Sequence, residues 1–339
     1  MPSQNAGMQI PSHLAEIAPG IYAWLPDSPG AWGMANCTLI TSGSTALLVD
    51  TPYTARLTHR LKTAAYQVLP PPVEISTLVN THANGDHSYG NGEFPGAEII
   101  STEANLRHLC AEPAPEELER LLDQCDDAPF GRYLLAHFGR FDYRGLSLTP
   151  PTRTFTGVLD VPVDDLTVRL IEVGPAHTVG DLIVHVPDKD VVCAGDVLFV
   201  GDVPVHWAGP LDGVIDACQQ ILDLNPRIVI PGHGPPVGQR EVRAYMDYVA
   251  SARDRIHTLH AEGLDVDQAS RILLRERHPG LGLWERLAIL TAVEYRHLEN
   301  GSEAPQLVQM LKAAVRLAPE CVPGTTPVRH TFPPQPPRS

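Results

Sequence analysis

Residues 81–87 read Thr-His-Ala-Asn-Gly-Asp-His and contain three side chains of metal-binding type, His82, Asp86 and His87. Only Asn80 separates them from the run 75–79, whose composition is typical of a buried strand. A loop at the end of a strand can hold imidazole and carboxylate groups at the edge of a sheet, where catalytic side chains are often found. Neutral imidazole and carboxylate together suit zinc or non-haem iron, so this segment predicts a metal site.

Four more residues of metal-binding type follow strand-like runs elsewhere in the chain. His177 comes after the run 166–173, Asp196 ends the run 191–195, His233 ends the run 228–232 and Asp50 ends the run 47–49. A glycine lies near each of the first three and allows the backbone to come close to a site. We expect these side chains to meet the segment 81–87 at one edge of the fold.

Taken together, these residues resemble the pattern of the metallo-β-lactamase superfamily, His-x-His-x-Asp-His followed by His, Asp and Gly-His, each at a strand end. The resemblance covers about residues 17–235. It implies an α/β fold, the four-layer αβ/βα sandwich, and it implies that Asp50 orients the site from behind the ligands. The metal ligands that it implies are His82, Asp86, His87, His177, Asp196 and His233.

Asn84 stands where the superfamily pattern has its second histidine. The first metal would then keep His82, His177 and one oxygen of Asp196, while the ligands of the second metal are intact. Asn84 either caps the loop, as asparagine often does, or offers its amide oxygen to the metal or to water on it. We expect two zinc ions per chain, because an unpaired cluster of imidazoles and carboxylates is costly to bury. One iron or a mixed site is the alternative, since two histidines and a carboxylate also suit Fe(II).

This ligand set predicts a metal-dependent hydrolase. A bound metal lowers the pKa of water from 15.7 toward ~7, and we expect Asp86 to orient that water with Asn84 beside it. Ester, thioester, lactone and related acyl bonds of a small molecule suit this chemistry. The alternatives are an aromatic-polyketide cyclase or cyclase–thioesterase that polarises a carbonyl, a single-iron dioxygenase of persulfides, and a metal-binding protein without turnover. Trp32, His206 and Trp207 are candidates for the substrate pocket, because they lie in loops near the expected site.

Composition limits the partners that the protein can have. The 339 residues are 43% hydrophobic and 19% charged, which is ordinary for a soluble globular chain. The net charge of −15 argues against a nucleic-acid partner. The sequence has no apolar run of the ~20 residues that a membrane helix needs, and its first residues lack the pattern of a signal peptide. Its six cysteines contain no Cys-x-x-Cys pair, so we expect a cytoplasmic protein with reduced thiols. The negative charge favours a small-molecule substrate that is neutral, apolar or cationic. Nothing in the sequence indicates an oligomeric state.

The elements that must position the site follow from the periodicity of apolar residues. We expect a leader at 1–16, a metallo-β-lactamase-type domain at 17–240 with a helical insertion at about 102–141, a C-terminal helical extension at 241–320 and a disordered, proline-rich tail at 321–339. Strands are expected at 21–25, 36–40, 46–51, 75–79, 97–101, 153–156, 166–173, 181–186, 191–194 and 228–230. Helices are expected at 54–66, 212–224, from 240 onward, and at 265–276, 283–298 and 305–317.

Overall fold

The computed structural model describes residues 10–27, 30–277, 280–301 and 307–320. Its strands are β1 (Ala15–Ala18), β2 (Ile21–Trp24), β3 (Cys37–Ser42), β4 (Thr45–Val49), β5 (Ile75–Val79), β6 (Glu98–Thr102), β7 (Arg153–Phe155), β8 (Val158–Val163), β9 (Leu166–Glu172), β10 (Leu182–Val186), β11 (Val191–Phe199) and β12 (Ile228–His233). Its α-helices are α1 (Ala55–Ala65), α2 (Gly85–Ser88), α3 (Glu103–Leu109), α4 (Pro115–Asp123), α5 (Pro129–His137), α6 (Leu211–Asp223), α7 (Gln239–Ala261), α8 (Val266–Arg275), α9 (Leu287–Leu298) and α10 (Leu307–Leu317).

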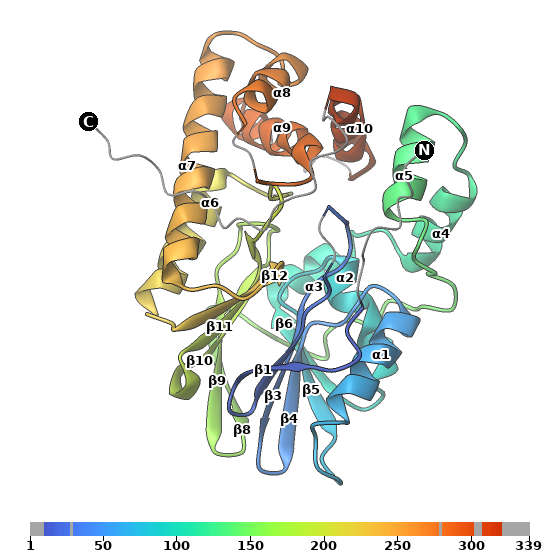
Figure 1. Ribbon diagram of the computed structural model, residues 1–339, viewed down its shortest axis with the longest axis vertical. Helices are drawn as coiled ribbons and strands as arrows, with labels where there is room; N and C mark the ends of the chain where they lie inside the picture. The colour runs from blue at the N-terminus through green and yellow to red at the C-terminus, as the bar shows by residue number, and fades with distance from the viewer. Residues whose placement is uncertain (1–9, 28–29, 278–279, 302–306, 321–339) are drawn as a thin grey trace.

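The strands form two sheets, and helices cover the outer face of each (Figure 1). One sheet has the order β1-β2-β3-β4-β5-β6-β7 and the other the order β12-β11-β10-β9-β8. Strands β1 to β4 form the expected antiparallel meander, and β4 to β7 are parallel. In the second sheet only β11 and β12 are parallel. Parallel neighbours bring their carboxyl ends to the same edge of a sheet, and this edge carries the site.

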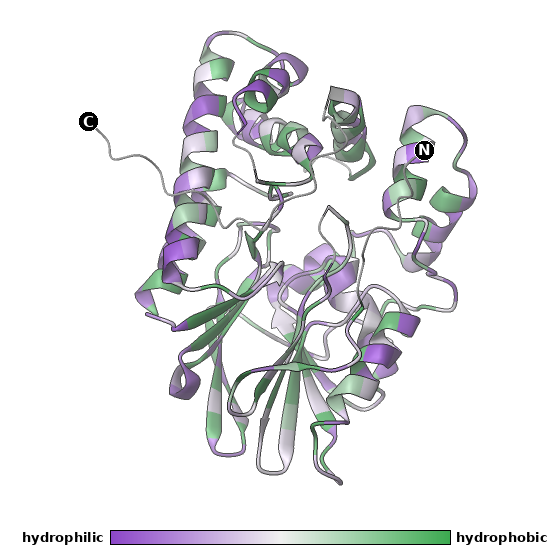
Figure 2. Cartoon of the chain, in the orientation of Figure 1, coloured by the Kyte–Doolittle hydropathy of each residue, from purple (hydrophilic) through white to green (hydrophobic). Residues whose placement is uncertain are grey.

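Alternation along the central strands explains the four layers. In β4, Leu47 and Val49 point toward the second sheet, whereas Ala46 and Leu48 point toward α1. Successive side chains of a strand point to opposite faces, so a strand that is apolar at every position is buried on both. Figure 2 shows the apolar residues along the strands and the polar residues on the outer surfaces of the helices. The expected α/β fold and its αβ/βα layering are confirmed.

Helix α1 shows how local sequence sets the bounds of an element. Thr54 precedes the helix, and its side chain accepts a hydrogen bond from the backbone N–H of Leu57 at 3.2 Å. This N-cap satisfies one of the N–H groups that the first turn leaves without a partner. Leu57, Leu61 and Ala64 recur at helical spacing and are buried against the first sheet. The helix ends at Ala65, close to the end expected at residue 66.

The described structure departs from the expectations at three strands. Strand β1 begins at Ala15, inside the range 1–16 of the expected leader, because it pairs with β2. Strand β8 was not expected, although its Val161 and Val163 alternate inward beside β9. Strand β11 continues past Asp196 to Phe199, because an irregularity in its pairing with β12 around Gly195 lets the chain bend and go on. Most of the expected leader and the whole tail at 321–339 lie outside the described residues.

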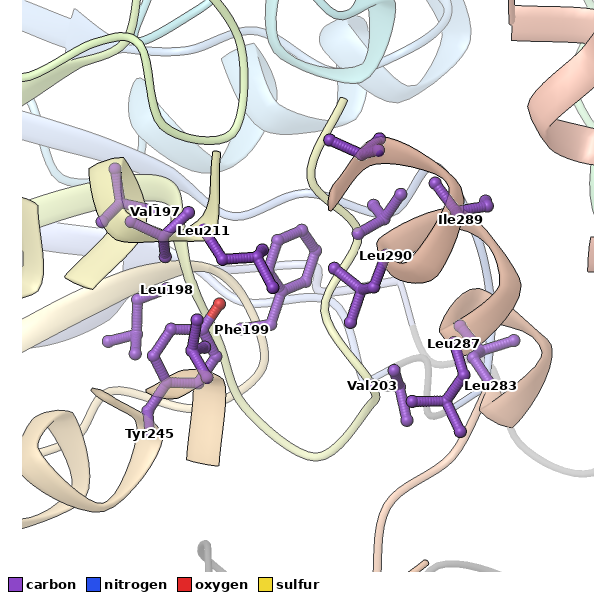
Figure 3. Close-up of a cluster of buried hydrophobic side chains, with 14 of the residues drawn as sticks. Val197, Leu198, Phe199, Val203, Leu211, Tyr245, Leu283, Leu287, Ile289 and Leu290 are labelled. Atoms are coloured by element: carbon purple, nitrogen blue, oxygen red, sulfur yellow. The ribbon is translucent and has the colours of Figure 1, made fainter. Parts of the chain in front are cut away.

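The C-terminal helices share a hydrophobic core with the second sheet. Figure 3 shows Leu198 and Phe199 at the end of β11 with Tyr245 of α7 nearby, and Leu287 and Leu290 of α9 in the same cluster. Helices α8, α9 and α10 lie at the same end of the molecule as α4 and α5, which fall in the range 102–141 (Figure 1), and α10 contacts α5. These helices therefore enclose the edge of the sandwich where the candidate site lies. In the described parts of the chain, no helix is both long and apolar enough to span a membrane.

Candidate metal centre

The loop after β5 brings three of the predicted ligands together. The chain leaves β5 at Val79 and enters the short helix α2 at Gly85, so that His82 lies before the helix and Asp86 and His87 lie within it. Asn80 holds this loop closed, because its side-chain N–H donates to the backbone carbonyl of His87 at 2.9 Å. His82 and His87 are almost completely buried, and their ring centroids lie 4.1 Å apart.

Asp196 lies at the centre of the site. Its Oδ2 is 3.3 Å from His233 Nε2, 3.5 Å from His177 Nε2 and 3.9 Å from His82 Nε2, and its Oδ1 is 3.2 Å from His87 Nε2. The ligand atoms form two groups with spacing suitable for a metal ion, and the carboxylate of Asp196 lies within reach of both. The first group is His82, His177 and Asp196, and the second is Asp86, His87 and His233.

Glycine is required where β12 passes this carboxylate. A Cβ atom on Gly232 would lie 1.8 Å from Asp196 Oδ1, so any side chain there would displace the carboxylate. At the neighbouring Gly195, φ is +53° and a Cβ atom would lie 2.8 Å from the side chain of Thr81. Glycine adopts this left-handed conformation at little cost. The two glycines thus let β11 and β12 place Asp196 and His233 beside the loop after β5.

Hydrogen bonds fix which nitrogen of each imidazole faces the centre. His177 Nδ1 lies 2.7 Å from the carbonyl oxygen of Val205, and His233 Nδ1 lies 3.2 Å from that of Met34. A carbonyl oxygen only accepts, so both rings donate through Nδ1. Their Nε2 lone pairs therefore point toward the site, which is the orientation that a metal requires.

Asp50 fixes the other two rings. Its Oδ2 accepts from His87 Nδ1 at 2.8 Å and from the Thr81 hydroxyl at 2.8 Å. Because the Thr81 hydroxyl donates its proton to Asp50, its oxygen can only accept a hydrogen bond from His82 Nδ1, 3.0 Å away. Asp50 lies directly after β4 and is buried, so it orients two imidazoles without reaching the site itself.

The atoms at the centre suit a metal ion. His82 Nε2, His87 Nε2 and Asp196 Oδ1 are buried and have no hydrogen-bond partner within the described structure. Leaving such groups unpaired is costly, and a divalent cation satisfies them together. Nitrogen and carboxylate oxygen are the ligands that zinc and iron prefer, so the donor set fits the metals expected from the sequence.

Burial and neighbouring charges set the protonation of the ligands. Burial lowers the pKa of His82 well below its ordinary value and lowers that of His177 to about 4, so both rings are neutral. Burial also disfavours charged His87, but the three surrounding carboxylates prevail and raise the pKa of this imidazole well above its ordinary value. Although burial opposes it, the surrounding imidazoles hold the pKa of Asp196 well below the usual range. The carboxylates thus favour a positive charge at the centre, which a metal ion supplies.

Asn84 points into this centre. It occupies the N-cap position of α2, but its side chain makes no capping hydrogen bond. Its Oδ1 lies 2.7 Å from His177 Nε2 and 3.2 Å from Trp207 Nε1. The amide therefore belongs to the surroundings of the first group of ligands rather than to the helix.

A cavity of about 300 Å³ opens above the ligands. Asn84, Asp86, His177, Asp196 and His233 line its floor, and its walls are mainly apolar. Many of the apolar wall residues come from three helices: Leu118, Leu121 and Leu122 of α4, Leu134 and Phe138 around α5, and Leu307, Val308 and Leu311 of α10. An apolar cavity with a few converging polar groups is typical of a small-molecule site.

The three pocket candidates from the sequence lie in different places. Trp32 and Trp207 line the cavity, with their ring centroids 6.2 Å apart. His206 is fully buried behind His177 and is not among the described lining residues. Its Nε2 lies 3.0 Å from the hydroxyl of Tyr245 in α7. After β11 the chain turns so that position 207 faces the cavity and position 206 faces the core, which corrects the expectation for His206.

Sequence reasoning did not find the residues that anchor the loop of Trp32. Its Nε1 donates to the hydroxyl of Tyr133 at 3.1 Å, and that hydroxyl donates to Glu285 Oε1 at 3.0 Å. The guanidinium of Arg286 lies 4.1 Å from the centroid of the Trp32 ring. Glu285 and Arg286 belong to a 3₁₀ turn, Trp284–Arg286, directly before α9. These residues lie far apart in the sequence, and no local pattern links them.

Comparison with known structures supports the fold. The sec-alkylsulfatase Pisa1 from Pseudomonas sp. is similar over 85% of this chain, at 19% sequence identity and a TM-score of 0.64. This chain spans about half of that protein, 50% of its length. VMB-1 matches 71% of this chain and 99% of its own, at 16% identity and a TM-score of 0.51. TMB-1 matches 72% and 99%, at 17% identity and a TM-score of 0.50.

Comparison of the sequence with protein families gives one further result. No curated protein matches the chain. The model of the metallo-beta-lactamase superfamily matches residues 30–233, a range that begins in the loop of Trp32 and ends at the predicted ligand His233. Because this match covers more than half of the 339 residues, the chain belongs to the metallo-beta-lactamase superfamily.

Proposed function

We propose that the protein is a hydrolase that uses two zinc ions to cleave an ester, thioester, lactone or related acyl bond of a small, largely apolar molecule. The observation that carries the proposal is the shared position of Asp196 between two groups of metal ligands on the floor of an apolar cavity. Two adjacent metal sites beside a cavity suit hydrolysis, because both the attacking and the leaving oxygen can be stabilised there.

Each ion has its own set of ligands in this proposal. His82, His177 and Asp196 would hold the first ion, and Asp86, His87, Asp196 and His233 would hold the second. When bound, the ions supply Lewis acidity and lower the pKa of a coordinated water. The hydrogen bonds of the four Nδ1 atoms keep the imidazoles in the form that binds metal.

The other side chains of the site position the reactants. Asp86 lines the cavity floor, and its Oδ2 is 3.5 Å from His233 Nε2, so its carboxylate is placed to orient the attacking water and accept its proton. The leucines of α4 and α10 exclude bulk water and hold the apolar part of the substrate. Exclusion of water strengthens every electrostatic interaction at the floor.

The charges of the cavity favour an uncharged substrate. Glu112 and Glu117 line the wall, and Arg286 is the only lysine or arginine among the described lining residues. Arg286 stacks on Trp32, and its Nη1 donates to the carbonyl of Val203 at 3.1 Å, so part of its donor capacity is already used. An anionic substrate would therefore meet more acidic than basic groups along the wall. Neutral acyl compounds fit this wall better than sulfate esters do.

The test is metal analysis combined with a substrate panel. Protein purified without chelators should contain two zinc ions per chain and hydrolyse aryl esters, thioesters or lactones with apolar acyl chains. Chelation should abolish the activity and zinc should restore it. Secondary alkyl sulfates belong in the panel as the anionic contrast, because one structural neighbour is described as a sec-alkylsulfatase.

Two variants sharpen this test. Asp86→Asn should lower kcat strongly, whereas Glu117→Gln changes a second carboxylate of the cavity without touching a ligand group and should leave kcat within a few-fold. A protein with two zinc ions and no activity on any acyl substrate would refute the proposal. One iron per chain with oxygen consumption on persulfides would replace it with dioxygenase chemistry. Carbon–carbon bond formation on an aromatic polyketide would replace it with cyclase chemistry.

A further inference from the structure

We infer that Asn84 gives its amide oxygen to the metal ion at the first group of ligands, and that the indole N–H of Trp207 holds this oxygen in place. The inference rests on the proposed two-metal site. It assigns a ligand at the position where the superfamily pattern has a histidine, and it assigns a positioning role to a cavity residue.

The indole decides which end of the amide faces the site. Trp207 Nε1 lies 3.2 Å from the side-chain Oδ1 of Asn84. An indole N–H can only donate, so the amide atom that it faces must be the oxygen. The opposite orientation of the amide would place an NH₂ group against this N–H, two donors face to face. The amide of Asn84 is therefore locked with its oxygen toward the site.

The same oxygen of Asn84, itself an acceptor, also faces the acceptor atom Nε2 of His177. It lies 2.7 Å from His177 Nε2, and Nδ1 of that ring must carry a proton, because it lies 2.7 Å from the carbonyl oxygen of Val205, which can only accept. In the form of the ring that binds a metal, Nε2 therefore has the lone pair. A lone pair of the amide and a lone pair of the imidazole thus point into the same small space. Two acceptors at this distance repel each other unless a cation lies between them, and a metal ion bound to both satisfies each.

The alternative role for Asn84 is capping of α2, and the geometry argues against it. Asn84 has the N-cap position, yet its side chain accepts no hydrogen bond from the first turn. The backbone carbonyl of Asn84 accepts from His87 N at 3.0 Å, so the residue contributes to the turn through its backbone alone. The side-chain amide is therefore free to bind a metal ion at the first group of ligands.

Backbone hydrogen bonds hold Trp207 close to His177. Its backbone N–H donates to the carbonyl of His177 at 2.7 Å, and Ala208 N donates to the same carbonyl at 3.0 Å. Its ring centroid lies 6.4 Å from that of His177. The indole is therefore fixed relative to the imidazole of His177, which would bind the same metal ion as Asn84. Outer partners of this kind commonly change metal affinity by 10- to 100-fold when removed.

Metal titration of the apoprotein tests the inference. Cobalt(II) is the probe, because its visible absorption bands report the ligands of each site, and zinc content after dialysis gives the stoichiometry. Asn84→Ala should weaken binding of the ion at the first group by about 10- to 100-fold and leave the second group unchanged. Asn84→His should bind the ion at the first group more tightly than Asn84→Ala does, because imidazole Nδ1 is attached to Cγ just as the amide oxygen is.

A pair of tryptophan variants isolates the orienting bond. Trp207→Phe keeps an aromatic ring but loses the N–H, so it should weaken binding at the first group by about tenfold and shift the cobalt bands of that site. Trp32→Phe is the matched control, because Trp32 also lines the cavity but donates its N–H to Tyr133. It should leave the titration unchanged. Thermal unfolding of each apoprotein checks that the variants are folded.

Three outcomes overturn the inference. They are an Asn84→Ala variant with both ions at wild-type affinity, a Trp207→Phe variant whose titration matches that of Trp32→Phe, and a wild-type protein that binds one ion at the second group alone. Failure of the proposed function looks different. Two ions with the expected response to Asn84→Ala but no hydrolysis of any acyl substrate would refute the function and leave the ligand assignment standing.

Discussion

Replacing Asp50 with asparagine should weaken metal binding at the second group of ligands. Asp50 Oδ1 accepts from the backbone N–H of Thr81 at 2.7 Å, and Oδ2 accepts from the Thr81 hydroxyl and from His87 Nδ1, both at 2.8 Å. Donors face both oxygens, so whichever position the NH₂ group of asparagine takes, it meets a donor. The backbone N–H of Thr81 cannot turn away from Oδ1, whereas the Thr81 hydroxyl at Oδ2 can rotate and accept a hydrogen bond, so the oxygen should stay at the Oδ1 position and the NH₂ group should take the Oδ2 position. His87 then loses its acceptor.

The magnitude follows from this lost contact. Without Asp50, His87 Nδ1–H has no acceptor, and the ring gains by moving its proton to Nε2, the atom that must bind the metal. Loss of such a partner lowers metal affinity by about 10- to 100-fold, which corresponds to about 1.4 to 2.8 kcal/mol. The buried unpaired donor should also lower the free energy of unfolding by about 1 to 3 kcal/mol. The backbone adds no cost, because φ of residue 50 is +62° and asparagine tolerates this region well.

Asp181 provides a matched control. It is also buried and accepts from the backbone N–H of Thr178 at 2.8 Å and from its hydroxyl at 2.7 Å, without the bond to an imidazole that Asp50 makes. Asp181→Asn should therefore lower the unfolding temperature but leave metal affinity intact. Competition for zinc with a chromophoric chelator measures both variants. Wild-type affinity in Asp50→Asn, or an equal loss of affinity in both variants, would refute this account of Asp50.

Three more predictions concern the cavity, the loop of Trp32 and pH. Leu121→Asp should raise KM for long-chain esters at least tenfold, because it places a charge in the apolar wall. Leu135→Asp, on the exposed side of α5, should leave KM unchanged. Steady-state kinetics over a series of acyl chain lengths compares the two variants. Tyr133→Phe leaves the Trp32 N–H without its acceptor and should cost about 1 to 3 kcal/mol of unfolding free energy in urea denaturation; an unchanged midpoint would contradict the role of this contact. Burial lowers the pKa of His137 to about 4, below its unfolded value of about 6.5, so the unfolded chain binds this proton more tightly and stability should fall by up to about 3 kcal/mol as pH falls from 6.5 to 4. His137→Asn should flatten that part of the curve of unfolding temperature against pH, and identical curves would show that burial does not lower the pKa of this ring.

The convergence of Asp50 and the candidate metal ligands at one edge could be predicted because the strand-like runs that precede them are recognisable. Apolar runs with strand character end at or near Asp50, His82, His177 and His233, and parallel strands bring their ends to one edge. Strand β11 shows the limit of this reasoning. A local pattern cannot reveal that the pairing with β12 becomes irregular around Gly195 and then resumes, so Asp196 was expected at the end of the strand rather than within it.

Contacts between distant parts of the chain could not be predicted. Asn84 and Trp207 are 123 positions apart, and the sequence alone leaves Asn84 equally suited to a cap and to a ligand. The same holds for His206, which faces Tyr245 in α7 instead of the cavity. An amphipathic helix reveals which of its faces is apolar, but not whether that face meets the core or a substrate. For this reason the walls of the cavity appeared only in the structure.

The cavity has a floor that carries the candidate metal ligands and a roof, the part of its wall that α4, α5 and α10 form. The floor comes from the edge of the two sheets, whereas the roof comes from helices outside them, and α10 also lies beyond the range that the superfamily model matches. Mutations that reshape the roof need not move any metal ligand, and changes in the ligands need not alter the roof. Selection could therefore change what the protein accepts and how it reacts along separate routes. Grafting α4, α5 and α10 from a relative is the corresponding route for redesign of its substrate range.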